Sequence, residues 1–297
     1  MGNNFNSPAE VVDANIAAGK VKANLSLPKM ILLGILAGFF IAIGGEASSL
    51  ASHNIANVGL ARTITGAVFP VGLMMIVLVG GELFTGNTMI VMAVMQKEAT
   101  WLQYARNLVV VFFSNLVGSL IIAYLTYFSG QWNYTDGALG AYTMKIALGK
   151  VNLSFGTAFA SGILCNILVC VAVLMAISAK DIAGKILAIF FPIFAFVISG
   201  FEHCVANMYY IPAGLIAKTN PQYVEKAEEL YGITADKLNA LTVGGMVKNM
   251  IPVTLTGWHM LINIPDLLLR MIHITALFML RSLVMKELTL LRQPPSL

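Results

Sequence analysis

Long charge-free stretches constrain this chain more than any other feature of its sequence. No residue between Arg106 and Asp136, or between Lys150 and Lys180, is charged. A helix needs only about 20 apolar residues to cross a bilayer, so each stretch is long enough. Charged residues make up 11% of the whole chain, whereas soluble proteins average about 25%. Because a helix pairs its own backbone polar groups in lipid, the pattern predicts an all-α membrane protein.

Six apolar segments are candidates for spanning helices. They run from about Met30 to Ala51, Thr63 to Gln96, Arg106 to Asp136, Lys150 to Lys180 and Ile186 to Ala217, and from near Leu241 onward. We therefore expect one transmembrane domain over residues 30–297, with halves at about 30–128 and 155–280. Basic residues slightly favour the loops on the N-terminal side, which predicts a multi-pass protein of the inner (cytoplasmic) membrane with both termini in the cytoplasm.

Residues 1–29 form a separate, polar segment without the apolar core of a cleavable signal peptide. Ser7, Pro8 and Glu10 are spaced as a capping box with proline at the first helical position. The helix that follows, roughly Pro8 to Lys22, places Val11, Val12 and Ile16 near one face. It is either an amphipathic helix on the membrane surface or a solvated leader.

The second and fifth segments are too long for one straight span, and each contains a glycine-rich break. Gly80 to Asn87 and Gly200 to Asn207 both follow the pattern G-x-E-x-x-x-x-N. Lipid does not tolerate a broken helix unless the break is buried in protein or lines a polar passage. Paired broken helices in two halves are typical of a transport site built on an inverted repeat.

The same repeat relates the asparagines of the third and sixth segments. Asn107 and Asn115 open the third segment, and Asn249 stands at the matching place in the sixth, which predicts a second asparagine at position 257. The chain has Thr256 and Gly257 there instead. Either the sixth helix has diverged, or residues 256–297 do not represent the native reading frame.

Transfer of a bare monovalent anion into hydrocarbon costs tens of kcal/mol. Helix N-termini offset such a cost, and we expect half helices to restart near Thr88 and Met208. Glu82 and Glu202 are poor anion ligands. They are expected to hold the loops by accepting hydrogen bonds from freed backbone N–H groups and from Asn207 or Asn87 across the repeat.

His203 is the strongest candidate for a residue in the substrate path, because it lies inside the second break. A neutral ring donates a hydrogen bond to an anion, and an imidazolium pairs with or protonates one. The other three histidines are read as ordinary structural residues. The cysteines Cys165, Cys170 and Cys204 have no metal-ligand spacing and are expected to pack as small apolar residues, so no metal or cofactor is predicted.

These motifs resemble the formate/nitrite transporter family. The resemblance rests on residues 81–87, 115–118 and 199–208, with Ile211 to Gly214 and Ile251 to Thr254 in support. It implies a six-transmembrane, aquaporin-like bundle with two broken helices, assembled as a homopentamer with one pore per subunit. It also implies roles for particular residues: constrictions at Leu83 and Phe196, the loop residue Thr85, the central His203, its neighbour Asn166, and Lys150 as an attractor of anions.

The function expected is transport of a small monovalent anion, with a pore histidine that couples transport to pH. Formate or nitrite is favoured, and hydrosulfide and lactate stay open, as do channel and proton-coupled modes. The alternative is a neutral-solute channel of aquaporin type, but the two Asn-Pro-Ala motifs of that family are absent. A membrane enzyme is disfavoured because the apolar segments hold no HExxH or GxSxG motif. Scattered basic residues exclude nucleic-acid binding.

Overall fold

The computed structural model describes residues 4–257, and this part of the chain contains helices and loops but no strand. Its longer helices are α1 (Pro8–Ala23), α2 (Leu27–Ser52), α3 (Val58–Val68), α4 (Val71–Val79), α7 (Trp101–Phe128), α8 (Ala138–Val151), α9 (Phe155–Ser178), α10 (Ile182–Ser199), α11 (Cys204–Ala217) and α12 (Pro221–Tyr231). The shorter ones are α5 (Phe84–Asn87), η1 (Thr88–Ile90), α6 (Val91–Met95), η2 (Gln131–Asn133) and α13 (Ala235–Leu238). The predicted all-helical membrane fold is confirmed.

Within residues 4–257, five helical segments are long and apolar enough to cross a membrane: Leu27–Ser52, Val58–Val79, Trp101–Phe128, Phe155–Ser178 and Ile182–Ser199. The predicted sixth span begins in a helix over residues 243–257. Its remainder, which includes most of the divergent stretch 256–297, lies outside the described residues.

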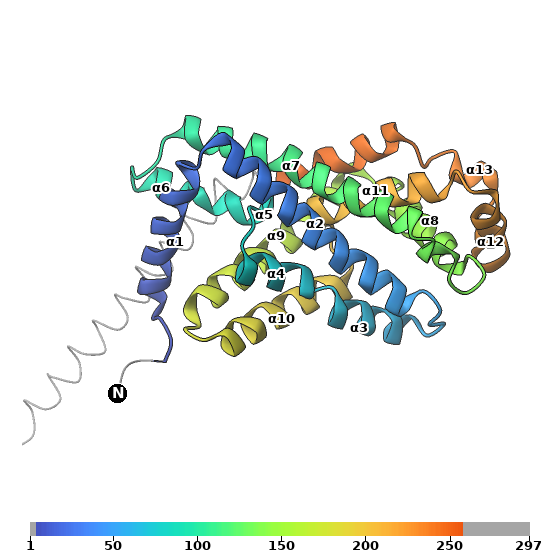
Figure 1. Cartoon of the computed structure of the whole chain (residues 1–297), viewed down its shortest axis with the longest axis horizontal. Helices are drawn as coiled ribbons and strands as arrows, with labels where there is room; N and C mark the ends of the chain where they lie inside the picture. The colour runs from blue at the N-terminus through green and yellow to red at the C-terminus, as the bar shows by residue number, and fades with distance from the viewer. Residues whose placement is uncertain (1–3, 258–297) are drawn as a thin grey trace, which may run out of the picture.

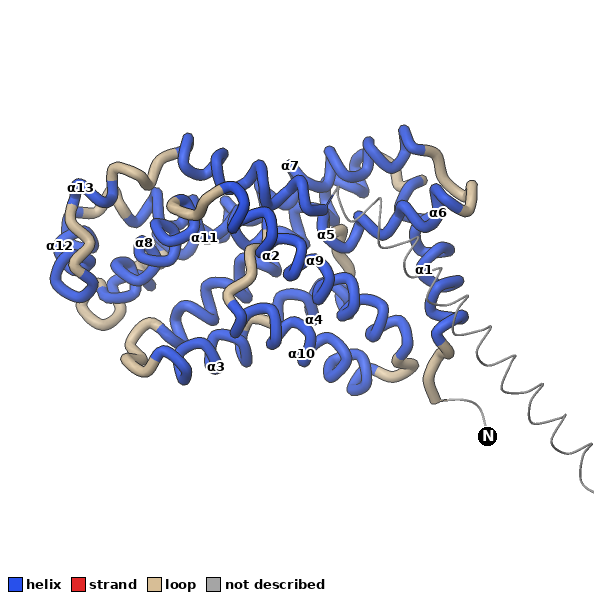
Figure 2. The backbone as a smooth tube through the Cα atoms, turned by 180° about the vertical axis from the view of Figure 1, so that it is seen from behind, coloured by secondary structure: helices blue, strands red, loops and turns tan. Residues whose placement is uncertain are grey.

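The molecule has two opposite ends along its long axis. Figure 1 places α1 and α6 at one end, which we call the α1 end, and α12 and α13 at the other, the α12 end. Helix α2 runs between them, and its 26 residues extend for about 39 Å at 1.5 Å per residue. A hydrocarbon core is about 30 Å thick, so the two ends lie on opposite faces of the bilayer. Seen from behind in Figure 2, α3, α4 and α10 form one layer beneath α2.

Glycines bring the backbones of α2 and α7 into direct contact. A Cβ built on Gly38 would lie 2.0 Å from the carbonyl oxygen of Asn115, and one built on Gly118 would lie 2.0 Å from that of Ile35. Small residues allow such close approach between membrane helices, where packing replaces the hydrophobic effect as the driving force. This contact positions Asn115 against the first helix break.

We expect Gly38→Ala to destabilise the folded protein by about 1–3 kcal/mol, because the added methyl group forces the two backbones apart. The measurement is thermal unfolding of the purified protein in detergent. Gly156→Ala is the matched control, since no heavy atom lies within 4 Å of the added Cβ. Equal melting temperatures for both variants would contradict this packing.

The predicted breaks lie at the expected glycines. Helix α4 ends before Gly80, which has φ 107°, and α10 ends before Gly200, which has φ 70°. Both values fall where side chains other than glycine are strained. The helices restart at Phe84 and Cys204 rather than near Thr88 and Met208, so that prediction was wrong by four residues. A further interruption between α3 and α4, at Pro70, was not predicted.

Helix α1 begins at the predicted capping box, with Ser7 and Glu10 each accepting a hydrogen bond from the other's backbone N–H. That backbone bond from Ser7 lowers the pKa of the exposed Glu10 carboxyl. The buried stripe differs from the predicted one, because it contains Val11, Asn15, Gly19 and Ala23. It packs on α6, α9 and η1, so the polar Asn15 faces inward and contacts Met92 Sδ.

Candidate functional site

His203 and Thr85 meet where the two broken helices restart. His203 is the N-cap of α11, and its Nδ1 accepts a hydrogen bond from Ala206 N at 3.0 Å. Its Nε2 lies 3.1 Å from Thr85 Oγ1. A backbone N–H only donates, so Nδ1 carries no proton, and the neutral ring holds its proton on Nε2. Nε2 therefore donates to Thr85, which leaves the Thr85 hydroxyl hydrogen available for another acceptor.

Apolar side chains lie beside His203 in space and close to Thr85 in the sequence. The Phe196 ring lies 6.0 Å from the His203 ring between centroids, and packs edge-on against Phe69 at 5.6 Å. Leu83, two residues before Thr85, is 3% exposed, and Phe196 is 4% exposed. Phe69 was not singled out from the sequence, because nothing in an apolar segment marks one phenylalanine among many.

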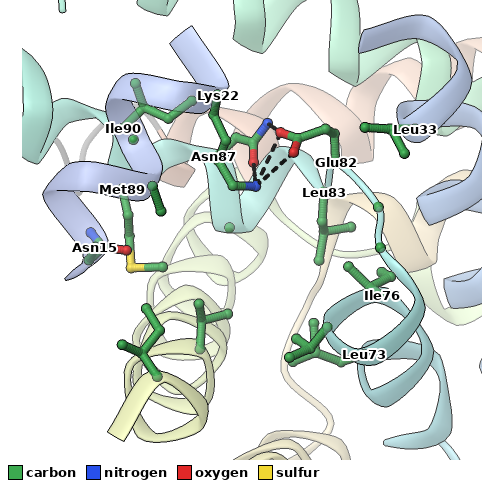
Figure 3. Close-up of a pocket in the computed structure, with 18 residues that line it drawn as sticks. Asn15, Lys22, Leu33, Leu73, Ile76, Glu82, Leu83, Asn87, Met89 and Ile90 are labelled. Carbon is green, nitrogen blue, oxygen red and sulfur yellow. Dashed lines mark hydrogen bonds and ion pairs between the residues drawn. The ribbon is translucent and has the colours of Figure 1, made fainter. Parts of the chain in front are cut away.

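A cavity of about 380 Å³ opens beside Leu83 and is lined by residues of α1, α4 and the first break. We call it the α1-end cavity. Figure 3 shows Lys22, Glu82 and Asn87 bonded together at its wall, with Leu83, Ile76 and Leu73 successively below them in the view. The cavity extends from α1 to the Leu83 side chain.

The first break is held by a cluster of four polar residues. Lys22 Nζ lies 3.0 Å from Glu82 Oε1, and Asn87 Nδ2 donates to Glu82 Oε2 at 2.6 Å. Asn87 also donates to Asn107 Oδ1 at 2.8 Å, and Asn107 Nδ2 donates to the carbonyl oxygen of Lys22 at 3.0 Å. The buried carboxylate is thereby paired with a cation and hydrogen-bonded, as burial of a charge requires.

The second break repeats the cluster residue for residue. Lys150 Nζ lies 2.9 Å from Glu202 Oε1, and Asn207 Nδ2 donates to Glu202 Oε2 at 2.7 Å. Asn207 also donates to Asn249 Oδ1 at 2.8 Å, and Asn249 Nδ2 donates to the carbonyl oxygen of Lys150 at 2.9 Å. Lys22 and Lys150 are thus equivalent positions of the internal repeat, an equivalence that no sequence motif marks.

The structure corrects the expected partners of the two glutamates. Glu82 and Glu202 each bond to the asparagine of their own motif rather than across the repeat, and to a lysine rather than to the freed backbone N–H groups. A spacing of five residues places Glu82 within the break and Asn87 one turn into the next helix, which lets the side chains meet. Lys150, which is expected to attract anions, pairs with Glu202, and its side chain is 15% exposed.

The repeat fails at position 257. In the first half Asn115 Oδ1 accepts from Phe84 N at 2.9 Å, while its Nδ2 donates to the carbonyl oxygen of Glu82 at 2.9 Å. Gly257 has no side chain to do the same at the second break. Its neighbour Thr256 accepts a hydrogen bond from Asn166 Nδ2 at 2.8 Å. Asn166, expected beside His203, is therefore bonded to the helix over residues 243–257.

The three cysteines are buried, and the described residues contain no group of three or more potential metal ligands. His53 bonds to the carbonyl oxygen of Leu50 through Nδ1, and its Nε2 lies 2.9 Å from Thr135 Oγ1.

The fold and the site together define a polytopic membrane channel or transporter. The features that define it are the apolar spans, the two helix breaks, the central histidine and the related pair of ionic clusters.

Comparison with known proteins agrees with this class. The pattern of the formate/nitrite transporter family matches residues 9–258. The "probable formate transporter" of Methanothermobacter thermautotrophicus is 39% identical, over 86% of this chain and 92% of the relative. The formate channel FocA of Haemophilus influenzae is 37% identical, over 84% of this chain and 88% of the relative. A solved "pentameric formate channel with formate bound" superposes with a TM-score of 0.75 at 33% identity, over 84% of this chain and 98% of that one. The chain belongs to the formate/nitrite transporter family.

Proposed function

We propose that the chain conducts formate through a pore in each subunit, and that the anion crosses the membrane midplane at His203 and Thr85. The observation that carries the proposal is the neutral His203–Thr85 pair at the N-terminus of α11, with the Phe196–Phe69 aromatic pair beside His203 and the buried Leu83 two residues before Thr85. Polar donors at that one place, within otherwise apolar walls, suit a small anion that has lost its water. The family membership and the formate channels among its relatives support the substrate.

Each part of the path has a distinct role in this proposal. Leu83 and the Phe69–Phe196 pair act as dry constrictions that exclude water and hydrated ions. Between them the Thr85 hydroxyl donates to the anion, and the positive N-terminal end of α11 stabilises its charge. Glu82 and Glu202, with their asparagines and lysines, hold the two breaks in shape and do not bind the anion.

His203 couples transport to pH in this proposal. As formate arrives, its negative charge favours imidazolium, and the ring takes up one proton from the external solution. The ring then transfers one proton to the carboxylate, so that HCOO⁻ and HisH⁺ become HCOOH and neutral His. Formic acid leaves without a charge, which avoids the cost of moving an anion through the second constriction. Protonation at Nδ1 is opposed by the Ala206 N–H bond, so the gained proton resides on the ring only while the anion is present.

The same proposal includes the assembly and location of the protein. Five copies form a homopentamer, as in the solved relative described as pentameric, with the α1 end in the cytoplasm and the protein in the inner membrane. Nitrite, hydrosulfide and lactate are the competing substrates.

The test is influx of radiolabelled formate into proteoliposomes at two external pH values. We expect influx above that of empty liposomes, faster at the lower pH, with no matching acceleration of glycerol. Glycerol influx without formate influx would favour a neutral-solute channel and contradict the proposal.

A further inference from the structure

Helix α2 carries a third buried glutamate, Glu46, whose surroundings differ from those of the glutamates at the two breaks. Glu46, Glu82 and Glu202 are all buried. Glu82 and Glu202 each pair with a lysine, whereas no salt bridge among residues 4–257 includes Glu46. The carboxyl group of Glu46 therefore lies inside the membrane domain without a counter-ion.

Two neutral donors hold one oxygen of this carboxyl group. Tyr209 of α11 donates its hydroxyl hydrogen to Glu46 Oε2, and Trp132 of η2 donates from Nε1 to the same oxygen at 3.5 Å. Both donor side chains are buried. Helix α2 lies directly against α11 at this point, since a Cβ built on Gly45 would lie 3.0 Å from the Tyr209 ring. The carboxyl group thus joins α2, η2 and α11.

The other oxygen, Glu46 Oε1, is buried and has no hydrogen-bond partner among residues 4–257. In a carboxylate it would be a charged oxygen enclosed in protein with no donor beside it. Burial of an unpaired charge costs far more than burial of a neutral polar group. A proton on Oε1 makes that oxygen a hydroxyl, while Oε2 remains a carbonyl oxygen that accepts from Tyr209 and Trp132. The geometry therefore fits a carboxylic acid rather than a carboxylate.

The charged and titratable groups on the elements around this part of α2 have other partners. On α7, the Tyr127 ring lies 5.9 Å from that of Trp132. The others are Arg62 on the carbonyl oxygen of Ile198, Lys145 over the Tyr231 ring, Lys150 on Glu202, His53 between Leu50 and Thr135, Tyr210 on Ser48, and Tyr142 on Ser52. Among the described residues, no cation is therefore placed to stabilise Glu46 after loss of its proton.

Glu46 lies nearer to the α12 end of the molecule than to the α1 end. It stands six residues before Ser52, the last residue of α2, which is about 9 Å at 1.5 Å per residue. The first residue of the helix, Leu27, is 19 residues away, or about 28 Å. The shorter route for a proton between Glu46 and water therefore leads to the α12 end.

We propose that Glu46 is a proton-binding site that locks α2, η2 and α11 together, and that release of its proton to the solution at the α12 end opens the lock. In this step the O–H bond at Oε1 breaks, the carboxylate keeps the electron pair, and water or hydroxide takes the proton. The new charge draws water into the buried contact and separates α2 from α11. Because α11 begins at the His203 cap, opening the lock distorts the proposed anion site and slows formate. Only this last consequence rests on the proposed function.

Infrared difference spectroscopy of the purified protein tests the protonation state. A glutamate exposed to water is ionised at about pH 7, so a carboxylic acid at that pH is diagnostic. Wild type minus Glu46→Gln should show the carbonyl stretching band of one protonated carboxyl group, shifted in D₂O. Glu98→Gln is the matched control, because Glu98 is exposed and pairs with Lys20, and its replacement should remove carboxylate bands alone. Absence of the acid band from the Glu46→Gln difference would overturn the proposal.

Trp132 reports the opening of the lock, because it donates to Glu46 and is buried. The other two tryptophans of the chain, Trp101 and Trp258, are replaced by phenylalanine so that Trp132 alone emits. We expect a rise from about pH 7 to about pH 9, where documented buried glutamates ionise, to shift its emission to the red. Acrylamide quenching should increase by about twofold or more, as water reaches the site.

Glu46→Gln in the same single-tryptophan background should hold both the emission and the quenching constant, because it has no proton to lose. Glu46→Met is a second neutral variant, used if the glutamine variant does not fold. Equal responses in the glutamate and neutral proteins, or no response in the glutamate protein, would overturn the lock.

Formate influx measures the consequence for transport. Between about pH 7 and about pH 9, the ratio of Glu46→Gln influx to wild-type influx should rise by about threefold or more, because only the wild type opens the lock. His203 is present in both proteins, so its own pH effect cancels in the ratio. A constant ratio would overturn the connection between the lock and the anion site. If neither protein conducted formate, the proposed function would fail, and the infrared and fluorescence results would still decide whether Glu46 operates a lock.

Discussion

Replacing Lys150 with methionine is expected to cost about 3–5 kcal/mol of folding free energy, because it leaves Glu202 charged and unpaired inside the membrane domain. The Glu202 side chain is only 6% exposed, and Lys150 is its one cationic partner among the described residues. Most single domains are stable by about 5–15 kcal/mol, so the loss removes a large part of the total. Thermal unfolding in detergent, with formate influx at equal protein level, measures it.

Two further variants separate the stability contribution of the ion pair from the effect of its position in the fold. Lys150→Met/Glu202→Gln removes both charges and should recover part of the lost stability, because a neutral amide costs less to bury. Lys22→Met, at the equivalent position of the repeat, should be milder, since the Lys22 side chain is 30% exposed and water reaches Glu82 more readily. A Lys150→Met protein that unfolds at the wild-type temperature would show that the pair contributes nothing.

Substitution of His203 by asparagine is expected to keep the fold and part of the formate flux while abolishing its dependence on pH. Asparagine is a good N-cap, so its side-chain oxygen can accept the Ala206 N–H bond that Nδ1 accepts in the wild type. The amide does not titrate between pH 5 and 8. Wild-type influx should rise as external pH falls, by at most about tenfold per unit for a step that consumes one proton.

The variant His203→Ala distinguishes the role of His203 as a helix cap from its role in proton transfer. Alanine removes both, so this variant should lose the pH response and also about 1 kcal/mol of stability. If His203→Asn keeps the wild-type pH profile, the ring does not exchange protons with the anion and acts only as a hydrogen-bond donor and helix cap.

The sequence was sufficient to predict features that depend on local chemistry. Charge-free stretches marked the spans, the spacing of Ser7 and Glu10 marked the start of α1, and the excess length of two segments located the breaks at Gly80 and Gly200. Each of these follows from a short window of residues and from the cost of exposing backbone or charge to lipid.

Features that join distant segments were harder to predict. Lys22 bonds to Glu82 across 60 positions and Lys150 to Glu202 across 52, and no local pattern pairs a lysine with one carboxylate rather than another. Helix α8 was missed because it is too short to span the membrane and carries Lys145 and Lys150.

Hydrogen bonding does not by itself distinguish His203 from His53, since each ring has two hydrogen-bond partners. Only the helix break around His203 does so.

A plug placed in the α1-end cavity tests most directly whether the anion passes beside Thr85 and His203. Gly86 lines that cavity, and no heavy atom lies within 4 Å of a Cβ built on it, so Gly86→Trp should fold and fill the passage. Gly156→Trp, at an equally open position on α9 outside the cavity, is the control. We predict formate influx at the level of empty liposomes for Gly86→Trp and at the wild-type level for Gly156→Trp. Wild-type influx through folded Gly86→Trp would contradict the account and place the anion path elsewhere.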